Sequence, residues 1–505
     1  MSDRMNMLIL MADQLTARAL PAYGNRVAKT PHIDSLAESG VVFDSFYCNS
    51  PLCAPSRFSF LSGRQVSAIG AYDNAAEFPA QVPTFAHCLR RAGYQTVLSG
   101  KMHFCGADPL HGFEERLTTD IYPADFGWTP DWNNFAHRPS WYHDMNSVIQ
   151  AGPCTRTNQI DFDDDVVYQA RQKLFDMARS KDKRPFCMVA SMTHPHDPYA
   201  IPHEYWDRYA GVEIDMPRVH IDADRLDPHS RRLRHVCGLD LQAISDAQVR
   251  AARRAYYGAV SYVDDQVGVL LRALADSRFA ANTVVLLIAD HGDMLGERGL
   301  WYKMSFFEPA CRIPLIVHSP QRFGARRVVE SASLVDLLPT LCELAGGAPP
   351  HYATPLDGTS LLPQLRGHSG KDEVIGEYLA EGAIAPLVMI KRGRYKFVHS
   401  PVDPDQLYDL RDDPDETQNL APLAKHAARM QEFRAEVARR WDLPAIHAAV
   451  VASQQRRHFV YDALRKGRYT SWDFQPSRDA SRQYVRNDQD LGDLEAMARF
   501  PPYQK

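Results

Sequence analysis

A cysteine at position 53 begins a segment whose residue types could do nucleophilic chemistry. The run Cys53-Ala-Pro-Ser-Arg57 leads through an apolar stretch to Ser62-Gly63-Arg64, which predicts a short helix that starts at the cysteine. The first turn of a helix offers unpaired N–H groups to an anion, and Arg57 adds a bidentate donor one turn later. The segment therefore predicts a thiol that faces an anionic ligand. A structural cysteine beside a surface arginine is the alternative.

Two acidic residues come directly after apolar runs. Residues 7–12 end at Asp13-Gln14, and residues 282–289 end at Asp290-His291. Such runs are typical of strands buried in a mostly parallel sheet, and ligands collect outside the carboxyl ends of these strands. Carboxylates in this place are candidate ligands of a hard metal ion, although an aspartate here can also be a turn residue.

Basic side chains follow two further predicted strands. The first strand runs into Lys101 and His103, which would point together on an extended chain because side chains alternate along it. The second runs into His194 and His196, whose neighbouring prolines predict a rigid, extended segment. These pairs are candidate active-site groups, and a solvated sheet edge is the alternative.

The cysteine segment resembles the signature of the type I sulfatases, C-x-[PA]-S-R-x(4)-[TS]-G-R, from Cys53 to Arg64. In that family the cysteine is oxidised after translation to formylglycine, whose hydrated aldehyde is the nucleophile. Other blocks agree with the family in order along the chain: G-K-x-H at Lys101, P-H-x-P at His196 and G-x-x-x-K at Lys303. At Asp290 the chain has D-H-G where most sulfatases have D-N-G, a variant found in choline sulfatases and in phosphonate monoester hydrolases. The resemblance implies a sulfuric ester hydrolase and a maturation system that generates formylglycine.

The same resemblance implies one bound divalent metal. Its expected ligands are Asp13, Gln14, Cys53, Asp290 and His291. Gln14 departs from the aspartate pair with which sulfatases open, and an amide oxygen ligates with less charge. Oxygen ligands favour Ca²⁺ or Mg²⁺, while a histidine ligand admits Mn²⁺. We expect Ca²⁺.

Catalytic roles also follow from the resemblance. Arg57, Lys101 and Lys303 would aim fixed positive charge at the sulfuryl oxygens. His196, with Lys303, would protonate the leaving oxygen. His103 would take a proton from the second hydroxyl of the sulfated formylglycine, which expels sulfate and regenerates the aldehyde.

Substrate-binding segments resemble the choline sulfatases in particular, among them residues 72–78, the aromatic loop within residues 108–132, and the tail. A quaternary ammonium group needs an aromatic face and a counter-charge rather than hydrogen bonds. Trp128 is the expected aromatic face. The other expected pocket residues are Asn74, His143 and Glu381. Packed loop residues are the alternative for this set.

Three other functions compete with the hydrolysis of choline O-sulfate. A phosphonate monoester or phosphodiester hydrolase is the nearest alternative, because those enzymes share the His291 variant and phosphorus esters need the same cations. An arylsulfatase could use the same site. A non-catalytic protein that binds choline sulfate and keeps Cys53 as a thiol belongs to another class. The chain has all the basic residues that the resemblance assigns to catalysis, and this argues against an inactive site.

Composition limits the partners and the location. The chain has 505 residues and a formal net charge of -5, so no overall field attracts nucleic acid or an anionic membrane. The N-terminal apolar run is short and lacks a small-residue cleavage site, which favours a strand over a signal peptide. No other stretch is long and apolar enough to span a membrane. Nine cysteines without paired spacing favour reduced thiols in a cytoplasmic protein.

These elements predict an α/β fold. The resemblance implies an alkaline-phosphatase-like architecture, in which helices sandwich a mixed, mostly parallel sheet and a smaller antiparallel sheet follows. Amphipathic spacing predicts helices over residues 161–178 and 251–274, and residues 390–399 are typical of a hairpin in the smaller sheet.

The expected domains are a catalytic α/β domain over residues 1–375, a small α+β domain over residues 376–453 and a tail over residues 454–505. The resemblance implies a homodimer or homotetramer in which the tail contacts a neighbouring subunit. Asp490 or Asp493 of the tail could then lie near the substrate cation.

Overall fold

The apolar runs of the sequence form the centre of an eight-stranded sheet in the computed structural model, which describes residues 4–122, 125–346, 352–468, 472 and 474–476. Strand β1 (Asn6–Ala12) lies between β7 (Phe186–Met192) and β9 (Thr283–Ala289) and is parallel to both. Every residue of these three strands is buried. Their continuous apolar pattern is explained by the layers that cover both faces of the sheet.

The remaining strands extend this sheet in the order β11-β2-β10-β9-β1-β7-β4-β5. Only β10 is antiparallel to its neighbours, and the other paired strands run parallel. The outer strands are β2 (Val41–Phe43), β4 (Gln95–Gly100), β5 (Glu115–Arg116), β10 (Leu315–His318) and β11 (Arg326–Val328). The expected mixed, mostly parallel sheet is confirmed.

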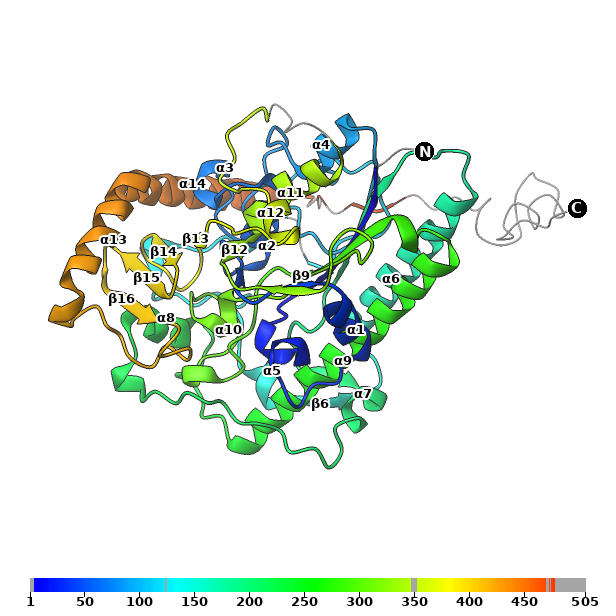
Figure 1. Cartoon of the computed structure of the whole chain (residues 1–505). Helices are drawn as coiled ribbons and strands as arrows, with labels where there is room; N and C mark the ends of the chain where they lie inside the picture. Colours follow the sequence, from blue (N-terminus) through cyan, green and yellow to red (C-terminus); the bar gives the residue numbers. More distant parts are fainter. Residues whose placement is uncertain (1–3, 123–124, 347–351, 469–471, 473, 477–505) are drawn as a thin grey trace, which may run out of the picture.

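Helices cover the sheet on two sides (Figure 1). One layer contains α1 (Pro31–Ser39), α6 (Asn158–Arg179) and α9 (Asp246–Asp276), which contact one another through α9. The other layer contains α2 (Cys53–Ser62), α4 (Phe85–Arg91) and α11 (Leu337–Leu344), which also pack together. The two long helices expected from the sequence are α6 and α9, each a few residues longer than predicted.

A second, antiparallel sheet of four strands follows the large one in sequence. Figure 1 shows it at the left of the view beside α13 (Ala427–Arg440), with α14 (Leu443–Leu464) drawn above the sheet. Its strands are β13 (Glu373–Tyr378), β14 (Leu387–Arg392), β15 (Tyr395–Ser400) and β16 (Asp403–Asp409). The expected hairpin is β14 with β15.

The small sheet has a hydrophobic core of its own. Side chains of β14 and β15, such as Ile390 and Phe397, pack against Phe433 and Val437 of α13. The predicted domain boundaries at residues 375/376 and 453/454 fall within β13 and α14. The division of the chain into three domains otherwise stays a prediction.

Short elements connect these layers. Two small parallel pairs join β3 (Phe46–Tyr47) to β12 (Ala332–Ser333) and β6 (Gly152–Cys154) to β8 (Ala200–Pro202). The short helices are α3 (Val66–Ile69), α5 (Asn146–Ile149), α7 (His203–Asp207), α8 (Pro228–Val236), α10 (Glu308–Cys311) and α12 (Leu362–Leu365). The 3-10 helices are η1 (Ala17–Ala19), η2 (Pro21–Tyr23), η3 (Phe126–Trp128), η4 (Trp132–Asn134), η5 (Ala223–Arg225), η6 (Ala280–Asn282), η7 (Glu297–Gly299), η8 (Leu334–Asp336) and η9 (Ala424–His426).

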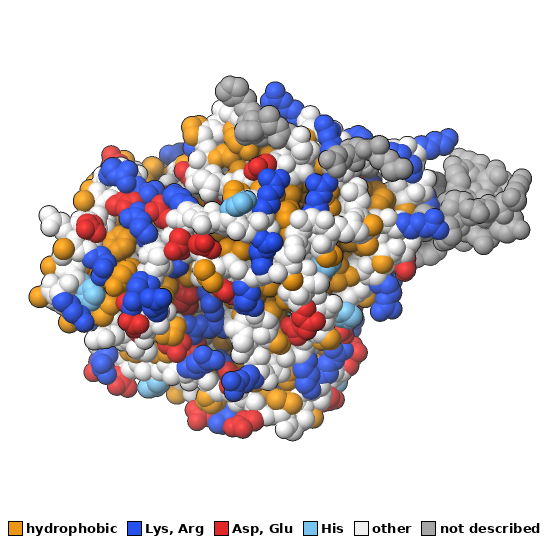
Figure 2. All heavy atoms as spheres, in the orientation of Figure 1, with side chains coloured by type: hydrophobic (Ala, Val, Ile, Leu, Met, Phe, Trp, Pro, Cys, Tyr) orange, Lys and Arg blue, Asp and Glu red, His pale blue; other side chains and the backbone are white. Residues whose placement is uncertain are grey.

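Acidic and basic side chains are interspersed over the face drawn in Figure 2, in keeping with the small net charge. In the part of the chain that the structure describes, no helix has the length and apolar character needed to cross a membrane. All nine cysteines are free thiols. The tail acids Asp490 and Asp493 lie outside the described residues, so their expected place near the substrate stays a prediction.

Candidate functional site

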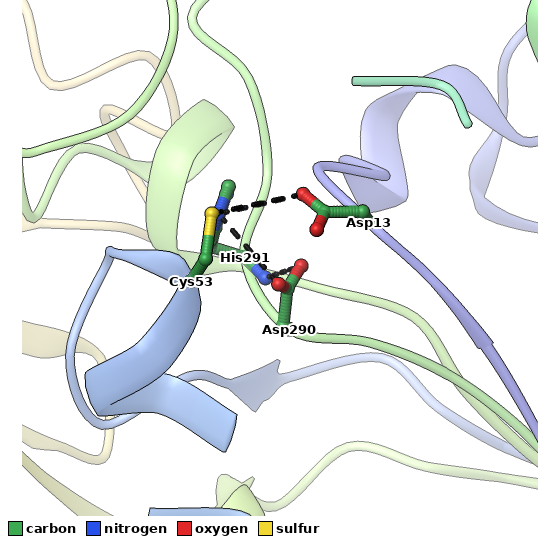
Figure 3. Close-up of side chains that lie close together, drawn as sticks. All are labelled: Asp13, Cys53, Asp290 and His291. Atoms are coloured by element: carbon green, nitrogen blue, oxygen red, sulfur yellow. Dashed lines mark hydrogen bonds and ion pairs between the residues drawn. The ribbon is translucent and has the colours of Figure 1, made fainter. Parts of the chain in front are cut away.

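Cys53 is the first residue of α2, as the sequence predicts, and it is buried. Its Sγ lies 3.2 Å from Nε2 of His291 and 3.9 Å from Oδ1 of Asp13. Figure 3 shows these side chains converging from separate elements. The helix start thus brings the thiol to the carboxyl edge of the large sheet.

The two predicted acidic positions meet at this edge because their strands are neighbours. Asp13 directly follows β1 and Asp290 directly follows β9, and the two strands run parallel in register. Ligand atoms of four buried residues lie within 4.8 Å of one another. These residues are Asp13, Cys53, Asp290 and His291.

The donor set of this cluster fits a divalent metal. Nδ1 of His291 lies 3.0 Å from the carbonyl oxygen of Gly292, so the N–H of this tautomer donates there and the Nε2 lone pair faces the carboxylates. Burial and nearby Lys303 lower the pKa of His291, which favours the neutral, ligating form. Two carboxylates with one neutral imidazole suit Ca²⁺, Mg²⁺ or Mn²⁺.

Gln14 lies beside the cluster and is held from both ends. Its backbone N–H donates to Oδ1 of Asp290 at 3.0 Å. Its side-chain Nε2 donates to Asp293 at 2.6 Å, and its Oε1 accepts from Nζ of Lys303 at 2.7 Å. Asp293 therefore fixes which end of the amide is oxygen, and that oxygen points toward the cationic side of the site.

Arg57 bridges the two carboxylates. Its Nε donates to Asp290 at 2.8 Å and its Nη2 to Asp13 at 2.9 Å, while Nη1 bonds Ser191 Oγ and the carbonyl oxygen of Lys101. Lys101 makes a further ion pair with Asp13. Burial alone would raise the pKa of Asp13, but Lys101 and Arg57 hold it well below its ordinary value. Arg57 thus orients the carboxylates as well as supplying charge.

Lys303 and His196 form a hydrogen-bonded pair in the same site. Nζ of Lys303 lies 2.8 Å from Nε2 of His196, and Nδ1 of His196 lies 2.6 Å from the carbonyl oxygen of Asp197. Burial and Lys303 hold the pKa of His196 well below its ordinary value. The pKa of Lys303 is raised, because Cys53 and Asp197 outweigh the opposing effect of burial. The proton shared by this pair therefore resides on Lys303 in the free site.

His103 lines the pocket, but its backbone is not extended as predicted. β4 ends at Gly100 and His103 has a left-handed φ of 61°. Oδ2 of Asp120 accepts hydrogen bonds from the N–H groups of Met102 and His103, and this turns the chain. Both ring nitrogens of His103 are buried without a hydrogen-bond partner within the described part of the chain, so they are available to a ligand.

The segment that carries His196 is turned rather than extended. The N–H of His196 donates to the carbonyl oxygen of Thr193 at 3.1 Å. His194 points elsewhere, because its Nδ1 lies 2.7 Å from Asp163 of α6. Of the two histidines, only His196 reaches the pocket.

A cavity of about 300 Å³ opens onto these groups. Its polar end is formed by Cys53, His103, His196 and Lys303. Its lining also includes the aromatic side chains of Trp128, Trp141 and Tyr142 and the carboxyl group of Glu381, with Asp144 and Asp197 as further acidic residues. The cavity thus offers an anion site and an aromatic compartment to a single small molecule.

The aromatic compartment is built from neighbouring rings. Trp128 and Trp141 are stacked with ring centroids 6.3 Å apart, and Trp141 meets Tyr142 at 4.5 Å. Trp128 also lies 5.6 Å from Tyr122, whose ring covers Nζ of Lys101 at 4.2 Å. Trp128 therefore lies at the junction of the two ends of the cavity.

Glu381 is the acidic residue of this compartment. It is 4% exposed, and its Oε2 is buried with no hydrogen-bond partner among the residues described. Burial raises the pKa of Glu381 to about 7. A buried, unpaired carboxylate oxygen costs free energy unless a ligand pairs with it, so this geometry suits a cationic ligand.

The remaining two predicted pocket residues also line the cavity. Oδ1 of Asn74 accepts a hydrogen bond from the N–H of Ala54 at 3.0 Å, so Asn74 supports the start of α2. His143 stacks on Tyr302 with centroids 4.5 Å apart, and its Nδ1 lies 3.6 Å from Asp197. Both residues have structural partners as well as access to a ligand.

The structure adds residues that the sequence did not single out. Trp141 and Tyr142 precede His143 directly, so the cluster of aromatics around His143 was a usable signal. Tyr122 and Asp197 also line the cavity, but one lies in an irregular loop and the other looks like a turn residue between prolines. Their part in the site depends on contacts that only the folded chain makes.

Known families match the chain over most of its length. A model described as Sulfatase matches residues 5–348. A model described as N-sulphoglucosamine sulphohydrolase, C-terminal, matches residues 296–441, and one described as Choline sulfatase enzyme C terminal matches residues 448–500.

Individual proteins are similar over nearly the whole chain. A choline-sulfatase of Rhizobium meliloti is 45% identical over 504 residues, which cover 98% of each protein. An arylsulfatase of Clostridium perfringens is 26% identical and covers 85% of this chain and 92% of its own. The solved structure of a phosphonate monoester hydrolase of Agrobacterium radiobacter superposes with a TM-score of 0.69 at 23% identity, covering 88% of this chain and 96% of that one. This last likeness supports the fold alone.

Proposed function

The chain belongs to the sulfatase family, and we propose that it hydrolyses choline O-sulfate to choline and inorganic sulfate. One observation carries this proposal. A single cavity presents the ammonium group of Lys303 beside His103 and His196, and also aromatic rings with the unpaired carboxyl oxygen of Glu381. A sulfate ester with a quaternary ammonium group is complementary to both sets of groups.

Cys53 would supply the nucleophile after conversion to formylglycine. A divalent metal, with Ca²⁺ our preferred ion, would be held by Asp13, Gln14, Cys53, Asp290 and His291, where it would polarise the sulfuryl oxygens and lower the pKa of the nucleophilic hydroxyl. The convergence of the Asp13, Cys53, Asp290 and His291 side chains supports this role, and the backbone N–H of Gln14 donates to Asp290 beside them.

The chain's own cations would then bind the sulfate group. Lys101 and Lys303 have buried ammonium groups held by Asp13 and by Gln14 with His196, and Arg57 keeps Asp13 and Asp290 in position. Such prearranged charges stabilise the charge that develops on the sulfuryl oxygens, each by about 3 kcal/mol when well placed.

Two groups would move protons. Lys303 carries the proton of its pair with His196, so this pair would protonate the leaving choline oxygen. His103 has both ring nitrogens unpaired among the described residues, and it would accept the proton of the second hydroxyl when sulfate leaves. Both roles need hydrogen-bond reach to the reacting oxygens.

Comparative kinetics tests the proposal. The substrates are choline sulfate, an aryl sulfate, a phosphonate monoester and the carbon isostere 3,3-dimethylbutyl sulfate, a neutral ester in the sense that an uncharged tert-butyl group replaces the trimethylammonium group of its alcohol. We expect choline sulfate to have the highest kcat/KM. Equal or faster turnover of the phosphonate monoester would replace the proposal with a phosphonate hydrolase, and no preference over the neutral isostere would remove the choline assignment.

The nucleophile and the metal can be tested directly. The peptide that contains Cys53 is expected to have the mass of the aldehyde rather than the thiol when a formylglycine-generating system is present. Elemental analysis of the same sample would identify the metal. A thiol mass together with tight choline sulfate binding would indicate the non-catalytic binding protein instead.

The location and assembly are also part of the proposal. Nine free thiols support a cytoplasmic, reducing compartment. A homodimer or homotetramer is expected from the family, and sedimentation would measure it.

A further inference from the structure

Helix α14 makes several hydrogen bonds and a ring contact with the loop that carries Trp128. These contacts together are named the grip. The loop over residues 126–132 contains η3 and contacts α14 directly. Oε1 of Gln454 accepts from the N–H of Trp132 at 3.0 Å, and Nε2 of His458 lies 3.3 Å from the carbonyl oxygen of Pro130. His447 also packs on the ring of Trp132 at 5.4 Å. Several side chains of one helix face thus hold a single loop.

Arg457 is the buried centre of this grip. Its Nη1 and Nη2 each donate to a different carboxylate oxygen of Asp73 at 2.7 Å, and Nη1 also donates to Oγ1 of Thr129 at 3.1 Å. The Arg457 side chain is 7% exposed and that of Asp73 is fully buried. A bidentate, buried pair of this kind fixes both distance and orientation.

The two partners of Arg457 are each adjacent to a residue of the pocket. Thr129 follows Trp128, and Asp73 precedes Asn74, and both Trp128 and Asn74 line the cavity. The planar guanidinium therefore ties together two segments that are about fifty residues apart in the sequence. Arg457 itself does not belong to the described residues that line the cavity.

We propose that Arg457 is a positioning residue that sets the preference for a quaternary ammonium substrate by holding the Trp128 loop against the segment of Asn74. The attraction between a cation and a ring depends on the placement of the ring face. A small shift of Trp128 therefore weakens recognition of the cation more than binding of the sulfate group. The inference rests on the proposed function and concerns the alcohol end of the same cavity.

The test compares variants that change the grip without leaving a buried charge unpaired. Arg457→Lys keeps the charge beside Asp73 but loses the fork that reaches Thr129. Thr129→Val keeps the shape of the side chain but removes the acceptor of Arg457 and the hydrogen bond that Oγ1 donates to the carbonyl oxygen of Phe126. Arg456→Gln, at an exposed position of the same helix, is the matched control. Each protein is assayed with choline sulfate and with 3,3-dimethylbutyl sulfate.

We expect both grip variants to lower the ratio of kcat/KM for choline sulfate to that for the neutral ester by about fivefold, chiefly through KM for choline sulfate. Turnover of the neutral ester should stay within about twofold of the wild type. The Arg456 variant should keep the wild-type ratio.

Two results would overturn the inference. Either an unchanged ratio in both grip variants, or an equal loss of both activities together with a lower Tm, would give Arg457 a structural role only. If Arg457→Lys does not fold, Thr129→Val decides alone. Failure of the proposed function is seen separately, because the wild type itself would then show no preference for choline sulfate.

Discussion

Glu381 carries a side-chain carboxyl group in an environment that disfavours its charge. Burial raises its pKa from 4.5 to about 7, with Asp73 adding to the shift and Lys303 opposing it. The raised pKa means that ionised Glu381 costs about 3 kcal/mol of folding free energy at high pH. A residue that destabilises the free protein in this way is expected to have a role with a ligand.

Replacement of Glu381 by glutamine should therefore separate stability from recognition. We expect Glu381→Gln to raise the free energy of unfolding at pH 8 by up to about 3 kcal/mol, because the buried charge is gone, and to change it little at pH 4.5. The same variant should lose about tenfold in kcat/KM for choline sulfate and little for 3,3-dimethylbutyl sulfate.

Denaturant titration and steady-state kinetics measure these two effects. Glu432→Gln is the matched control, since Glu432 is exposed on α13. Equal losses on both esters would mean that Glu381 does not contact the cation.

The pH dependence of recognition follows from the same carboxyl group. Folding raises the pKa of Glu381 from 4.5 to about 7. The contribution of Glu381 to the free energy of unfolding is therefore fully present below about pH 4.5 and is lost as the pH rises through about 7. Recognition has the opposite sign, because only the ionised form pairs with a cation. KM for choline sulfate should rise as the pH falls below about 7, whereas KM for the neutral ester should not follow this titration. Parallel pH profiles for the two esters would contradict this assignment.

At the scale of residues, side chains that belong to sequence motifs lie together in the structure. Cys53, Asp13, Asp290 and His291 converge as expected. The direction of each side chain could not be predicted in the same way. Arg57 was expected to face the anion, yet most of its donors bind acceptors of the protein, because the two carboxylates that flank it compete for them.

The start of α2 depends on a contact from another segment. Oδ1 of Asn74 accepts the N–H of Ala54, one of the helix N–H groups that have no partner within the helix. Leu52 at the N-cap provides no side-chain oxygen. Asn74 therefore caps the helix from a segment twenty residues further along the chain. It fixes the helix turn that begins with Cys53.

Removal of this cap should affect the nucleophile. We expect Asn74→Leu to lower the free energy of unfolding by about 1–2 kcal/mol, the usual effect of losing an N-terminal cap. It should also lower kcat for both esters, because Cys53 is then less well placed. Asn74→Asp keeps an oxygen acceptor and adds charge that the helix terminus favours, so it should retain the stability.

Thermal unfolding and kinetics on both esters measure this prediction. A selective loss on choline sulfate in Asn74→Leu, with unchanged kcat on the neutral ester, would instead make Asn74 a ligand of the alcohol group alone.

At the scale of elements, continuous apolar runs predicted β1, β7 and β9 well, because strands buried on both faces carry that pattern. The connecting segments were less predictable. The turn at His103 is imposed by Asp120, which is seventeen residues away in sequence. The grip of α14 on the Trp128 loop likewise comes from residues more than three hundred positions away. Neither follows from local spacing.

The two sheets of the molecule are joined by a buried charge cluster. Lys396 of β15 extends from the small sheet to the carbonyl oxygen of Phe306 at 2.6 Å and to Glu308 at 2.9 Å. It also pairs with Glu416 at 2.6 Å. Burial alone would lower the pKa of Lys396, but Cys311 and the two glutamates raise it. The ammonium group of Lys396 therefore binds acceptors from the large-sheet part and from the small-sheet part of the molecule.

This junction is relevant to the pocket because Glu381 lies in the connection between β13 and β14 of the small sheet. The carboxyl edge of the large sheet carries the cluster of Asp13, Cys53, Asp290 and His291, whereas the small sheet carries Glu381. The sequence analysis expected Glu381, within the small domain, as a pocket residue, and Glu381 does line the cavity. The position of Glu381 shows that docking of this sheet also completes the cavity.

Loss of Lys396 should weaken the whole fold. Lys396→Met keeps most of the side-chain volume but leaves two carboxylates buried without their shared cation, which typically costs about 3–5 kcal/mol. We expect a fall of this size in the free energy of unfolding, measured in guanidinium chloride. Replacing both glutamates by glutamine in the same variant should recover part of the loss, because the unpaired charges are then removed. Lys425→Met, at an exposed position, should have no such effect.

Selectivity gives a second measurement on the Lys396 variant. If docking of the small sheet positions Glu381, warming should reduce the preference for choline sulfate over the neutral ester before the sulfatase activity itself is lost. The cluster of Asp13, Cys53, Asp290 and His291 lies at the edge of the large sheet, away from this junction. Parallel loss of both activities would mean that the two sheets unfold as one cooperative unit, and that the cluster contributes to stability alone.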